Sequence, residues 1–425
     1  MVRGARGAGA LSQAGRGDLG VAASRREGEH LVTRVIAIAD SDSYLKWSAA
    51  TVRRLPSAYA SRQLMIANPV LPSASQIRAV SAEPVETLSF GAVRRMLRRE
   101  QPEVVLLACT GPVIAALLAT PEFTRPDRPV LVTGMPGVSV PASPRAVTLR
   151  AGCDLLVVHS RREQAEYAAL ADQLAPGLAV GLATLPFLAD STSPTPSPPA
   201  DRRDLVFAAQ AKVPETRADR ESILLALAET ESPVVKLRAT GVEPQTHREN
   251  WPYPVLAEDL VRQGRVGSKA IRFSSGSMAT ALNTARGLTT VSSTAALEAM
   301  ATGVPVLIIS DFGVSADLIN LVFADSGCLG ILDDLRADRL AQPDPAWSTA
   351  NYFHPDSDND WLGILGRLVD ARAAGPLPQR VRPRGSRPAR VRRRLRLAVP
   401  AVGWRFVRQV RDRTTRGRHR RRRTG

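Results

Sequence analysis

The chain has 425 residues and a formal net charge of +17, and 44% of its residues are hydrophobic. This length is too great for one small core and suits two domains. The composition excludes a chain that is disordered throughout, and no apolar run reaches the roughly 18 to 20 residues that a transmembrane helix requires. From Gly375 onward there are 19 Arg and one acid, Asp412, so this tail carries +18 and the preceding residues together carry −1.

Arginine supplies almost all of the positive charge, because only four residues are Lys: Lys46, Lys212, Lys236 and Lys269. This bias weakens any argument from Arg, whereas a Lys indicates a position that needs a compact ammonium group. The three cysteines are far apart in apolar runs. They predict buried, reduced thiols of a cytoplasmic protein, not disulfides or a metal site. Residues 1–30 lack the apolar segment of a secretory signal and are predicted to be disordered.

Short apolar strands alternate with helices over residues 31–188. Strands are predicted at residues 34–39, 63–67, 103–108, 129–133 and 154–158, and helices are predicted to begin near Tyr44, Pro112 and Arg161. Strands that are apolar throughout are typical of a parallel sheet with helices on both faces. This region is therefore expected to form a doubly wound, Rossmann-like domain.

Residues 189–203 are rich in Pro and Ser and are typical of an interdomain linker. The alternation resumes over residues 204–374. Strands are predicted at 204–208, 233–237, 271–273, 288–291 and 304–309, and helices at 217–230, 278–284 and 295–301. The predicted fold class is therefore α/β, with two doubly wound domains that face each other across a ligand-binding cleft, followed by the tail of residues 375–425.

Three hydroxyl residues, Ser292, Ser293 and Thr294, end a predicted strand and precede a predicted helix. Exposed N–H groups and hydroxyls at such a position favour an anion such as a phosphate. The alternative is ordinary helix capping, which needs only one of the three hydroxyls. Local physics leaves these two interpretations about equal.

The segment from Thr290 to Ile309 resembles the donor-binding segment of GT-B glycosyltransferases. The resemblance rests on Ser-Ser-Thr, Leu-Glu-Ala and Gly-Val-Pro-Val, and on the two-domain layout over residues 33–370. It implies a GT-B-like fold with a nucleotide-donor domain over 204–374 and an acceptor domain over 31–188. It also implies that Glu298 contacts a ribose or sugar hydroxyl. Thr290 stands where many retaining members carry a second Glu, which favours an inverting mechanism.

The Ser-Ser pair before a helix is also similar to bacterial sialyltransferases, polysialyltransferases and CDP-glycerol glycerophosphotransferases. There the pair holds the phosphate of a CMP or CDP donor, and a basic residue and a His-Pro pair follow the second strand of the domain. The corresponding residues here are Lys236, Arg238 and His247, although His247 precedes Arg248 and not Pro. Lys236 and Arg238 share a strand face by the two-residue alternation. For a loop His such as His247, a surface or capping role is the alternative.

Further candidates follow the ends of other predicted strands. Gln210 and Lys212 come after the first strand of the second domain and are expected to contact the nucleotide or phosphate, the alternative being a solvated loop. In the first domain, Asp42 is predicted to be the general base that deprotonates the acceptor hydroxyl, with Asp40 in a supporting role. The alternative for Asp42 is an N-cap of the helix that begins near Tyr44.

A loop of Gly and Pro follows another first-domain strand. Gly134, Gly137 and Ser139 in this loop are predicted to allow close approach of the acceptor. No P-loop, HExxH, paired CxxC or GxSxG motif is present, and neither a metal nor a cofactor is predicted. His247, Lys236 and the hydroxyl residues are expected to neutralise the departing phosphate.

The sequence thus predicts a glycosyltransferase that moves a sugar or polyol phosphate from a nucleotide-activated donor to a glycan or lipid-linked acceptor of the cell envelope or of a polysaccharide. Two alternatives remain: a non-hydrolysing nucleotide-sugar epimerase, and a nucleic-acid-binding protein that uses its Arg-rich tail. Few aromatic residues in the tail, only Trp404 and Phe406, weaken the second.

The tail, residues 376–425, mixes Leu, Val, Trp and Phe with Arg over residues 395–410. Such a mixture can place its apolar side in lipid and its guanidinium groups on anionic headgroups. The tail is therefore predicted to hold a cytoplasmic enzyme peripherally at the inner face of an anionic membrane. The alternative is a solvated tail enlarged by the Arg bias.

Overall fold

The computed structural model of the protein describes residues 32–68, 77, 84–189, 201–237 and 249–380. The predicted N-terminal extension, most of the predicted linker and nearly all of the Arg-rich tail lie outside these described residues. Arg238 and His247 lie outside them as well.

The first sheet has seven parallel strands in the order β3-β2-β1-β4-β5-β6-β7. They are β1 (Thr33–Ala39), β2 (Tyr59–Ile66), β3 (Glu86–Leu88), β4 (Val104–Ala108), β5 (Val130–Gly134), β6 (Leu155–Val158) and β7 (Ala179–Leu182). The helical segments are α1 (Asp42–Arg53), α3 (Phe90–Glu100), α4 (Gly111–Leu117), η1 (Pro121–Phe123), α5 (Pro144–Arg150), α6 (Arg161–Leu174) and α7 (Pro186–Ala189).

The second sheet has six parallel strands in the order β10-β9-β8-β11-β12-β13. They are β8 (Asp204–Ala208), β9 (Pro233–Lys236), β10 (Arg272–Ser274), β11 (Ala285–Thr290), β12 (Val306–Ile309) and β13 (Leu329–Gly330). The helical segments that follow α7 are α8 (Arg217–Ala228), α9 (Tyr253–Arg262), α10 (Met278–Asn283), α11 (Ala295–Ala301), η3 (Leu321–Phe323), α12 (Leu332–Arg336), α13 (Pro345–Ala350), η4 (Asp356–Asp358) and α14 (Trp361–Ala374).

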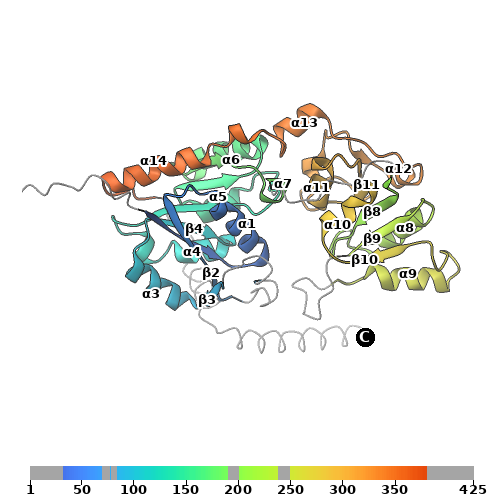
Figure 1. The fold of residues 1–425 in the computed structure, drawn as a ribbon, viewed down its shortest axis with the longest axis horizontal. Coiled ribbons are helices and arrows are strands. Elements are labelled where there is room, and N and C mark those ends of the chain that lie inside the picture. The colour runs from blue at the N-terminus through green and yellow to red at the C-terminus, as the bar shows by residue number, and fades with distance from the viewer. Residues whose placement is uncertain (1–31, 69–76, 78–83, 190–200, 238–248, 381–425) are drawn as a thin grey trace, which may run out of the picture.

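These two sheets confirm the predicted fold class of two doubly wound α/β domains with a GT-B-like layout. The central strands are apolar on both faces because helices cover both sides, and every residue of β4, β5 and β6 is buried. Each sheet separates two hydrophobic clusters, one on either face. In Figure 1 the first sheet lies in the left-hand domain and the second in the right-hand domain.

The last helix, α14, belongs by packing to the first domain. The sequence prediction assigned residues 204–374 to the second domain, whereas α14 contacts β5, β6 and β7, and its buried Trp361 and Leu365 join a core cluster of the first sheet. Figure 1 shows α14 running along the top of the left-hand domain. The apolar face of this helix needs a partner surface, and the first sheet provides it. The chain therefore crosses between the domains twice.

The carboxyl edges of the two sheets meet at the domain boundary. Val140, in the loop that follows β5, is buried in a core cluster of the second domain together with Leu282 and Ala296. The helices agree with this arrangement, since α11 contacts α7 and α13 contacts α6. Loops at the carboxyl ends of both sets of strands are thus brought toward each other, which is where ligands bind in open α/β sheets.

Candidate functional site

The second sheet changes its winding direction between β8 and β11, and this switch point brings two predicted site residues together. Gln210 follows β8 and Ser292 follows β11. The side-chain oxygen Oε1 of Gln210 accepts hydrogen bonds from the backbone N–H of Ser292 at 3.1 Å and from its hydroxyl at 3.0 Å. The crevice at such a reversal is the usual ligand position in a doubly wound sheet.

The hydroxyl residues between β11 and α11 have distinct roles. Thr290 donates from its hydroxyl to the carbonyl of Ala208 at 3.0 Å and accepts from the N–H of Ser293 at 3.2 Å. Ser293 accepts from the N–H of Ala295 at 3.2 Å, so its side chain caps the start of α11. Thr294 occupies the N-cap position, but its side chain makes no capping hydrogen bond. Helix capping therefore explains the side chain of Ser293 but not that of Ser292, which bonds to Gln210.

Lys236 and Glu298 place opposite charges beside this switch point. Lys236 ends β9, is only 6% exposed, and donates from Nζ to the carbonyl of Leu237 at 2.7 Å. Burial lowers the pKa of Lys236, while the charge of Glu298 raises it. Burial likewise raises the pKa of Glu298 in α11, and Lys236 opposes that shift. The ammonium group has three donors, so a bound anion can take those that Leu237 leaves.

The remaining predicted donor-site residues are less defined. Lys212 lies exposed in the loop that follows β8. Arg238 and His247 fall within residues 238–248, which lie outside the described residues, so their predicted contacts with the donor stay predictions. Sequence reasoning missed Arg220, which is buried beneath the loop that carries Gln210.

Asp40 and Thr110 meet at the switch point of the first sheet, between β1 and β4. Asp40 follows β1, and its Oδ2 accepts from the N–H of Thr110 at 2.8 Å and from its hydroxyl at 2.5 Å. Asp40 is buried, and burial raises the pKa of its carboxyl although both bonds from Thr110 oppose the shift. Each domain thus has a polar pair at its switch point.

Asp42 is the first residue of α1. The predicted alternative of an Asp N-cap is wrong, because α1 begins two residues before Tyr44 and Ser41 occupies the N-cap position. The side chain of Asp42 is partly exposed, and its Oδ2 accepts from Nζ of Lys46 at 2.8 Å, one helical turn on. A carboxylate here lies at the carboxyl end of β1 and at the favourable end of the helix dipole.

The predicted acceptor loop contains two residues with a structural explanation. A Cβ atom at Gly134 would lie 2.1 Å from the ring of Trp47, so this Gly allows close packing. The N–H of Ser139 donates to Oε1 of Glu163 at 2.7 Å. A Cβ at Gly137 would meet nothing within 4 Å, so Gly137 is the member of the three that borders open space.

Glu163 joins the two domains, a role that its sequence position does not reveal. Ser160 is the N-cap of α6, and Glu163, three residues on, has the spacing of a capping box; the Ser160 hydroxyl accepts from the N–H of Glu163 at 3.0 Å. The Glu163 carboxylate instead accepts from the N–H groups of Ser139 and His159 and, at 2.6 Å, from the hydroxyl of Tyr352. Tyr352 belongs to the second-domain core. Burial raises the pKa of Glu163.

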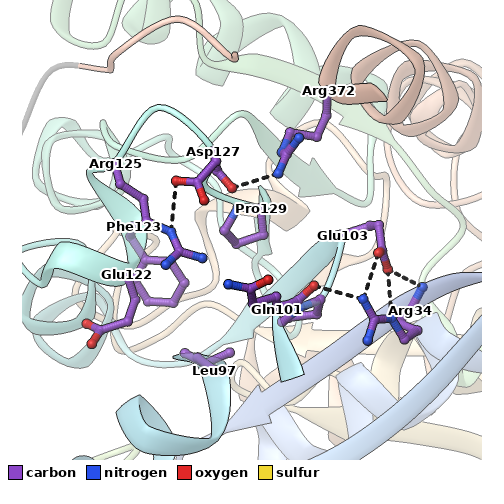
Figure 2. A pocket seen from close by; sticks show the side chains of 11 residues that line it. Arg34, Leu97, Gln101, Glu103, Glu122, Phe123, Arg125, Asp127, Pro129 and Arg372 are labelled. Carbon is purple, nitrogen blue, oxygen red and sulfur yellow. Dashed lines mark hydrogen bonds and ion pairs between the residues drawn. The ribbon is translucent and has the colours of Figure 1, made fainter. Parts of the chain in front are cut away.

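A cavity of about 200 Å³ lies elsewhere, at the amino edge of the first sheet (Figure 2). Its lining includes Arg34 at the start of β1 and Glu103, which precedes β4. Figure 2 shows two ion pairs within the lining, Arg34 with Glu103 at 2.9 Å and Arg125 with Asp127 at 3.0 Å. Glu122, which also lines the cavity, pairs with Arg94 and Arg98 outside it. This cavity is therefore distinct from both switch points and is not the candidate site.

Among the residues that the structure describes, no group of three or more His, Cys, Asp or Glu side chains is arranged to hold a metal ion. Over the same residues, no helix is both long enough and apolar enough to cross a membrane.

Two doubly wound domains with opposed carboxyl edges define the GT-B-like class of protein. The chain belongs to the family described as "Putative glycosyltransferase (DUF6716)", whose sequence model matches residues 35–368. It is therefore a member of a glycosyltransferase family. A search of curated proteins finds no match.

Solved structures are similar to this chain at low identity. One is described as "putative UDP-N-acetylglucosamine 2-epimerase from Listeria monocytogenes", with 14% identity, a TM-score of 0.46, and coverage of 84% of this chain and 94% of that chain. Another is the S. aureus MnaA–UDP co-structure, with 13% identity, a TM-score of 0.49, and coverage of 79% and 95%. A third is Anabaena Alr3699/HepE in complex with UDP and glucose, with 14% identity, a TM-score of 0.46, and coverage of 80% and 100%.

Proposed function

We propose that this protein transfers a sugar or polyol phosphate from a nucleotide-activated donor, bound by the second domain, to an acceptor bound by the first. The observation that carries the proposal is the Gln210–Ser292 pair at the second switch point, with buried Lys236 beside it. Membership of a glycosyltransferase family gives the reaction class. Switch points of doubly wound sheets are sites for nucleotides, which supports the assignment of the donor to this edge.

Lys236 supplies the charge that a departing phosphate requires. A buried ammonium group loses most of its hydration, and an anionic phosphate oxygen compensates for that loss with a charge-assisted hydrogen bond. As the glycosidic bond breaks, negative charge grows on the leaving phosphate, so a fixed cation is worth more in the transition state than in the ground state. Ser292, and Glu298 toward the sugar or ribose hydroxyls, complete the proposed donor site.

We propose a CMP- or CDP-linked donor, because the Ser-Ser pair and Lys236 lie on neighbouring parts of one sheet edge, as the sialyltransferase-like resemblance implies. A panel of CMP, CDP, UDP and GDP, measured by thermal shift and by calorimetry, tests this choice. We expect CMP or CDP to raise the melting temperature most. Tighter binding of UDP or GDP would replace the cytidine assignment and leave the transferase proposal standing.

In the first domain, Asp42 is the proposed general base. Its partly exposed carboxylate lies at the carboxyl end of β1, and the neighbouring Asp40 is fixed by Thr110. With a sugar donor, a base in this position removes the proton of an acceptor hydroxyl as that oxygen attacks the anomeric carbon from the face opposite the phosphate, which gives inversion. With a polyol-phosphate donor, the deprotonated oxygen attacks the transferred phosphorus, and the nucleoside monophosphate leaves. The acceptor is proposed to be a glycan or lipid-linked molecule of the cell envelope or of a polysaccharide, with Gly137 at the approach.

The decisive experiment measures nucleotide release with and without acceptors. A transferase releases free nucleotide only when an acceptor hydroxyl is supplied, so we expect release from the matching donor to depend on adding a cell-envelope glycan or lipid extract. Interconversion of the donor sugar at C2 without any acceptor would instead identify an epimerase. The Arg-rich tail, residues 376–425, is proposed to bring the enzyme to the inner, anionic face of the membrane where such acceptors lie.

A further inference from the structure

Arg220, in the first turn of α8, is the most completely bonded buried cation near the proposed donor site. Its side chain is 1% exposed. Nε donates to the carbonyl of Pro214 at 2.9 Å, and Nη2 donates to the carbonyls of Gln210 and Ala211 at 3.0 and 2.9 Å. Nη1 donates to the carboxylate of Glu249 and to the carbonyl of Trp251 at 3.0 Å. These contacts match the five N–H donors of a guanidinium group.

The five contacts join two loops that are distant in sequence. One loop follows β8 and contains residues 210–214, and the other leads into α9 and contains Glu249 and Trp251. The guanidinium carbon also lies 4.8 Å from the ring centroid of Tyr253, the first residue of α9, which adds a cation–π contact. Loss of these donors would leave the buried carbonyl of Pro214 and three part-buried carbonyls without this partner, so both loops depend on Arg220 for their backbone positions.

A short chain of hydrogen bonds leads from Arg220 to the switch point. Arg220 holds the carbonyl of Gln210, and the side chain of that same residue accepts both hydrogen bonds from Ser292. A shift of the Gln210 backbone would therefore move the side chain that orients Ser292. Arg220 itself is buried under the loop and does not face the site.

We propose that Arg220 is a positioning residue for donor binding, which acts by fixing the backbone of Gln210 and through it Ser292. This inference rests on the proposed function, because it gives a role to a residue that supports the proposed nucleotide site. A purely structural Arg would affect only the stability of the second domain. A positioning residue also changes nucleotide affinity, and it does so only while Gln210 is present.

The test is a double-mutant cycle on the full chain, with CMP, CDP, UDP and GDP as probes and the tightest binder carried through. Arg220→Lys keeps the charge opposite Glu249 but removes the forked geometry that reaches several carbonyls at once. We expect Arg220→Lys to raise the dissociation constant about tenfold, and Gln210→Ala to raise it by a similar factor. In the Gln210→Ala background, Arg220→Lys should change it less than about twofold, because coupled residues are not additive.

Arg128 provides a matched control in the other domain. It is also buried, and it pairs with Asp154 and donates to the carbonyls of Pro129 and Pro378 at the amino edge of the first sheet. Arg128→Lys should lower the melting temperature and leave the nucleotide dissociation constant unchanged. If Arg128→Lys weakens nucleotide binding as much as Arg220→Lys, loss of stability is the cause and the positioning role is overturned.

The outcomes separate this inference from the proposed function. If neither Gln210→Ala nor Ser292→Ala changes nucleotide affinity, the proposed donor site is wrong. If both weaken binding but Arg220→Lys is fully additive with Gln210→Ala, the site stands and the positioning role is overturned. Should Arg220→Lys fail to fold, Glu249→Gln removes only the ionic partner of Arg220, and its loss of affinity must show the same coupling to Gln210→Ala.

Discussion

Ser292 is the residue at which the proposed donor binding and folding can be tested separately. Its neighbour Ser293 caps α11, whereas, within the described part of the chain, the hydroxyl and the N–H of Ser292 both donate to Gln210. The single O–H of Ser292 donates to Gln210 in this structure and must turn to the phosphate when the donor binds. We expect Ser292→Ala to weaken binding of the preferred nucleotide by about 1 to 3 kcal/mol, the usual cost of losing a hydrogen bond to a charged group. Calorimetric titration measures this change.

The control for Ser292→Ala is Ser143→Ala. The Ser143 side chain caps α5 by accepting from the N–H of Ala146. Loss of this cap should cost about 0.5 to 2 kcal/mol of stability and leave nucleotide affinity at the wild-type value. An unchanged affinity in Ser292→Ala would remove the phosphate assignment.

Asp42 is the residue on which the proposed chemistry depends. We expect Asp42→Asn to lower turnover by at least about 100-fold, with little change in donor affinity, because a general base acts on the acceptor in the transition state. Steady-state kinetics at saturating donor, together with the dissociation constant of the nucleotide, separate the two effects.

Asp333→Asn is the matched control for Asp42→Asn. Asp333 lies in the first turn of α12 and pairs with Arg336 at 2.7 Å, one turn on, much as Asp42 pairs with Lys46. Any effect of removing a helix-initial carboxylate appears in both variants. Equal turnover in the two variants would mean that Asp42 only stabilises the start of α1 and is not the general base.

At the scale of elements, His159 joins α1, β6 and β7. The indole N–H of Trp47 in α1 donates to Nε2 of His159 at 2.8 Å. Indole is a donor only, so Nε2 accepts, and Nδ1 carries the proton and donates to the carbonyl of Ala183 at 2.9 Å. The carbonyl of Met135, also 2.9 Å from Nε2, then receives no hydrogen bond from this ring. Burial is the main cause that lowers the pKa of His159 to about 4. This ring is therefore neutral at pH 7, and its two nitrogens are occupied by structural contacts, so His159 is not available as a general base in place of Asp42.

The depressed pKa of His159 predicts a loss of stability in mild acid. Unfolded His takes up a proton near pH 6.5, whereas the folded protein takes it up only near pH 4. Between these values the unfolded state binds more protons, so stability falls as the pH falls. From pH 7.5 to pH 5 this linkage should cost about 2 kcal/mol. Urea unfolding at both pH values measures it.

The variant His159→Asn isolates this contribution. It lacks the titrating ring, so its stability is lower at pH 7.5 but should depend less on pH by about 2 kcal/mol over the same range. Glu163 lies close by and has a pKa that burial raises, which gives it the opposite pH dependence, so Glu163→Gln serves as the second comparison. An identical pH slope in wild type and His159→Asn would contradict the assigned pKa.

Elements with continuous apolar runs were predictable, and those with mixed surfaces were not. The predicted strand at 204–208 matches β8, and the predicted helix at 295–301 matches α11. The predicted strand at 63–67 covers only the buried end of β2, because Ala60, Ser61 and Arg62 are exposed and break the apolar run. The short strands β3, β7 and β13 were not predicted, since they carry too few buried residues to form a recognisable pattern.

At the scale of the whole molecule, the chain leaves the described structure at a fixed point on the first domain. Leu377 is buried in a first-sheet cluster, and Nε of Arg380 pairs with buried Asp154 at 2.9 Å. The Arg-rich segment beyond therefore starts from the amino edge of the first sheet, where Asp154 precedes β6. This places its attachment on the domain that is proposed to hold the acceptor.

This attachment point defines the truncation for a membrane test. The full chain should cosediment with vesicles that contain anionic lipid and bind weakly to neutral vesicles, since each basic residue near an anionic surface contributes about 1 kcal/mol. A chain that ends after Arg380 keeps the packed segment and should lose vesicle binding while it retains turnover on a soluble acceptor. Equal binding to neutral vesicles, or none to anionic ones, contradicts the anchor. Salt-sensitive binding to duplex DNA that exceeds vesicle binding would favour the nucleic-acid alternative.

The sequence by itself determined the α/β class, the two doubly wound domains and most of the central strands. Strands that are buried on both faces of a parallel sheet need continuous runs of apolar residues, and such runs are visible in the sequence. It also placed Gln210, Ser292, Asp40 and Asp42 at strand ends, since the carboxyl ends of parallel strands share one edge. Those are local properties, and local patterns express them.

Only the tertiary structure decided which of these side chains meet and which helix belongs to which domain. The Gln210–Ser292 contact, the return of α14 to the first sheet and the buried contacts of Arg220 all join residues far apart in sequence. Each of these contacts depends on partners that no local sequence pattern encodes. An apolar helix face can pack on any apolar surface, and a buried Arg can be recognised only from the carbonyls that accept its hydrogen bonds.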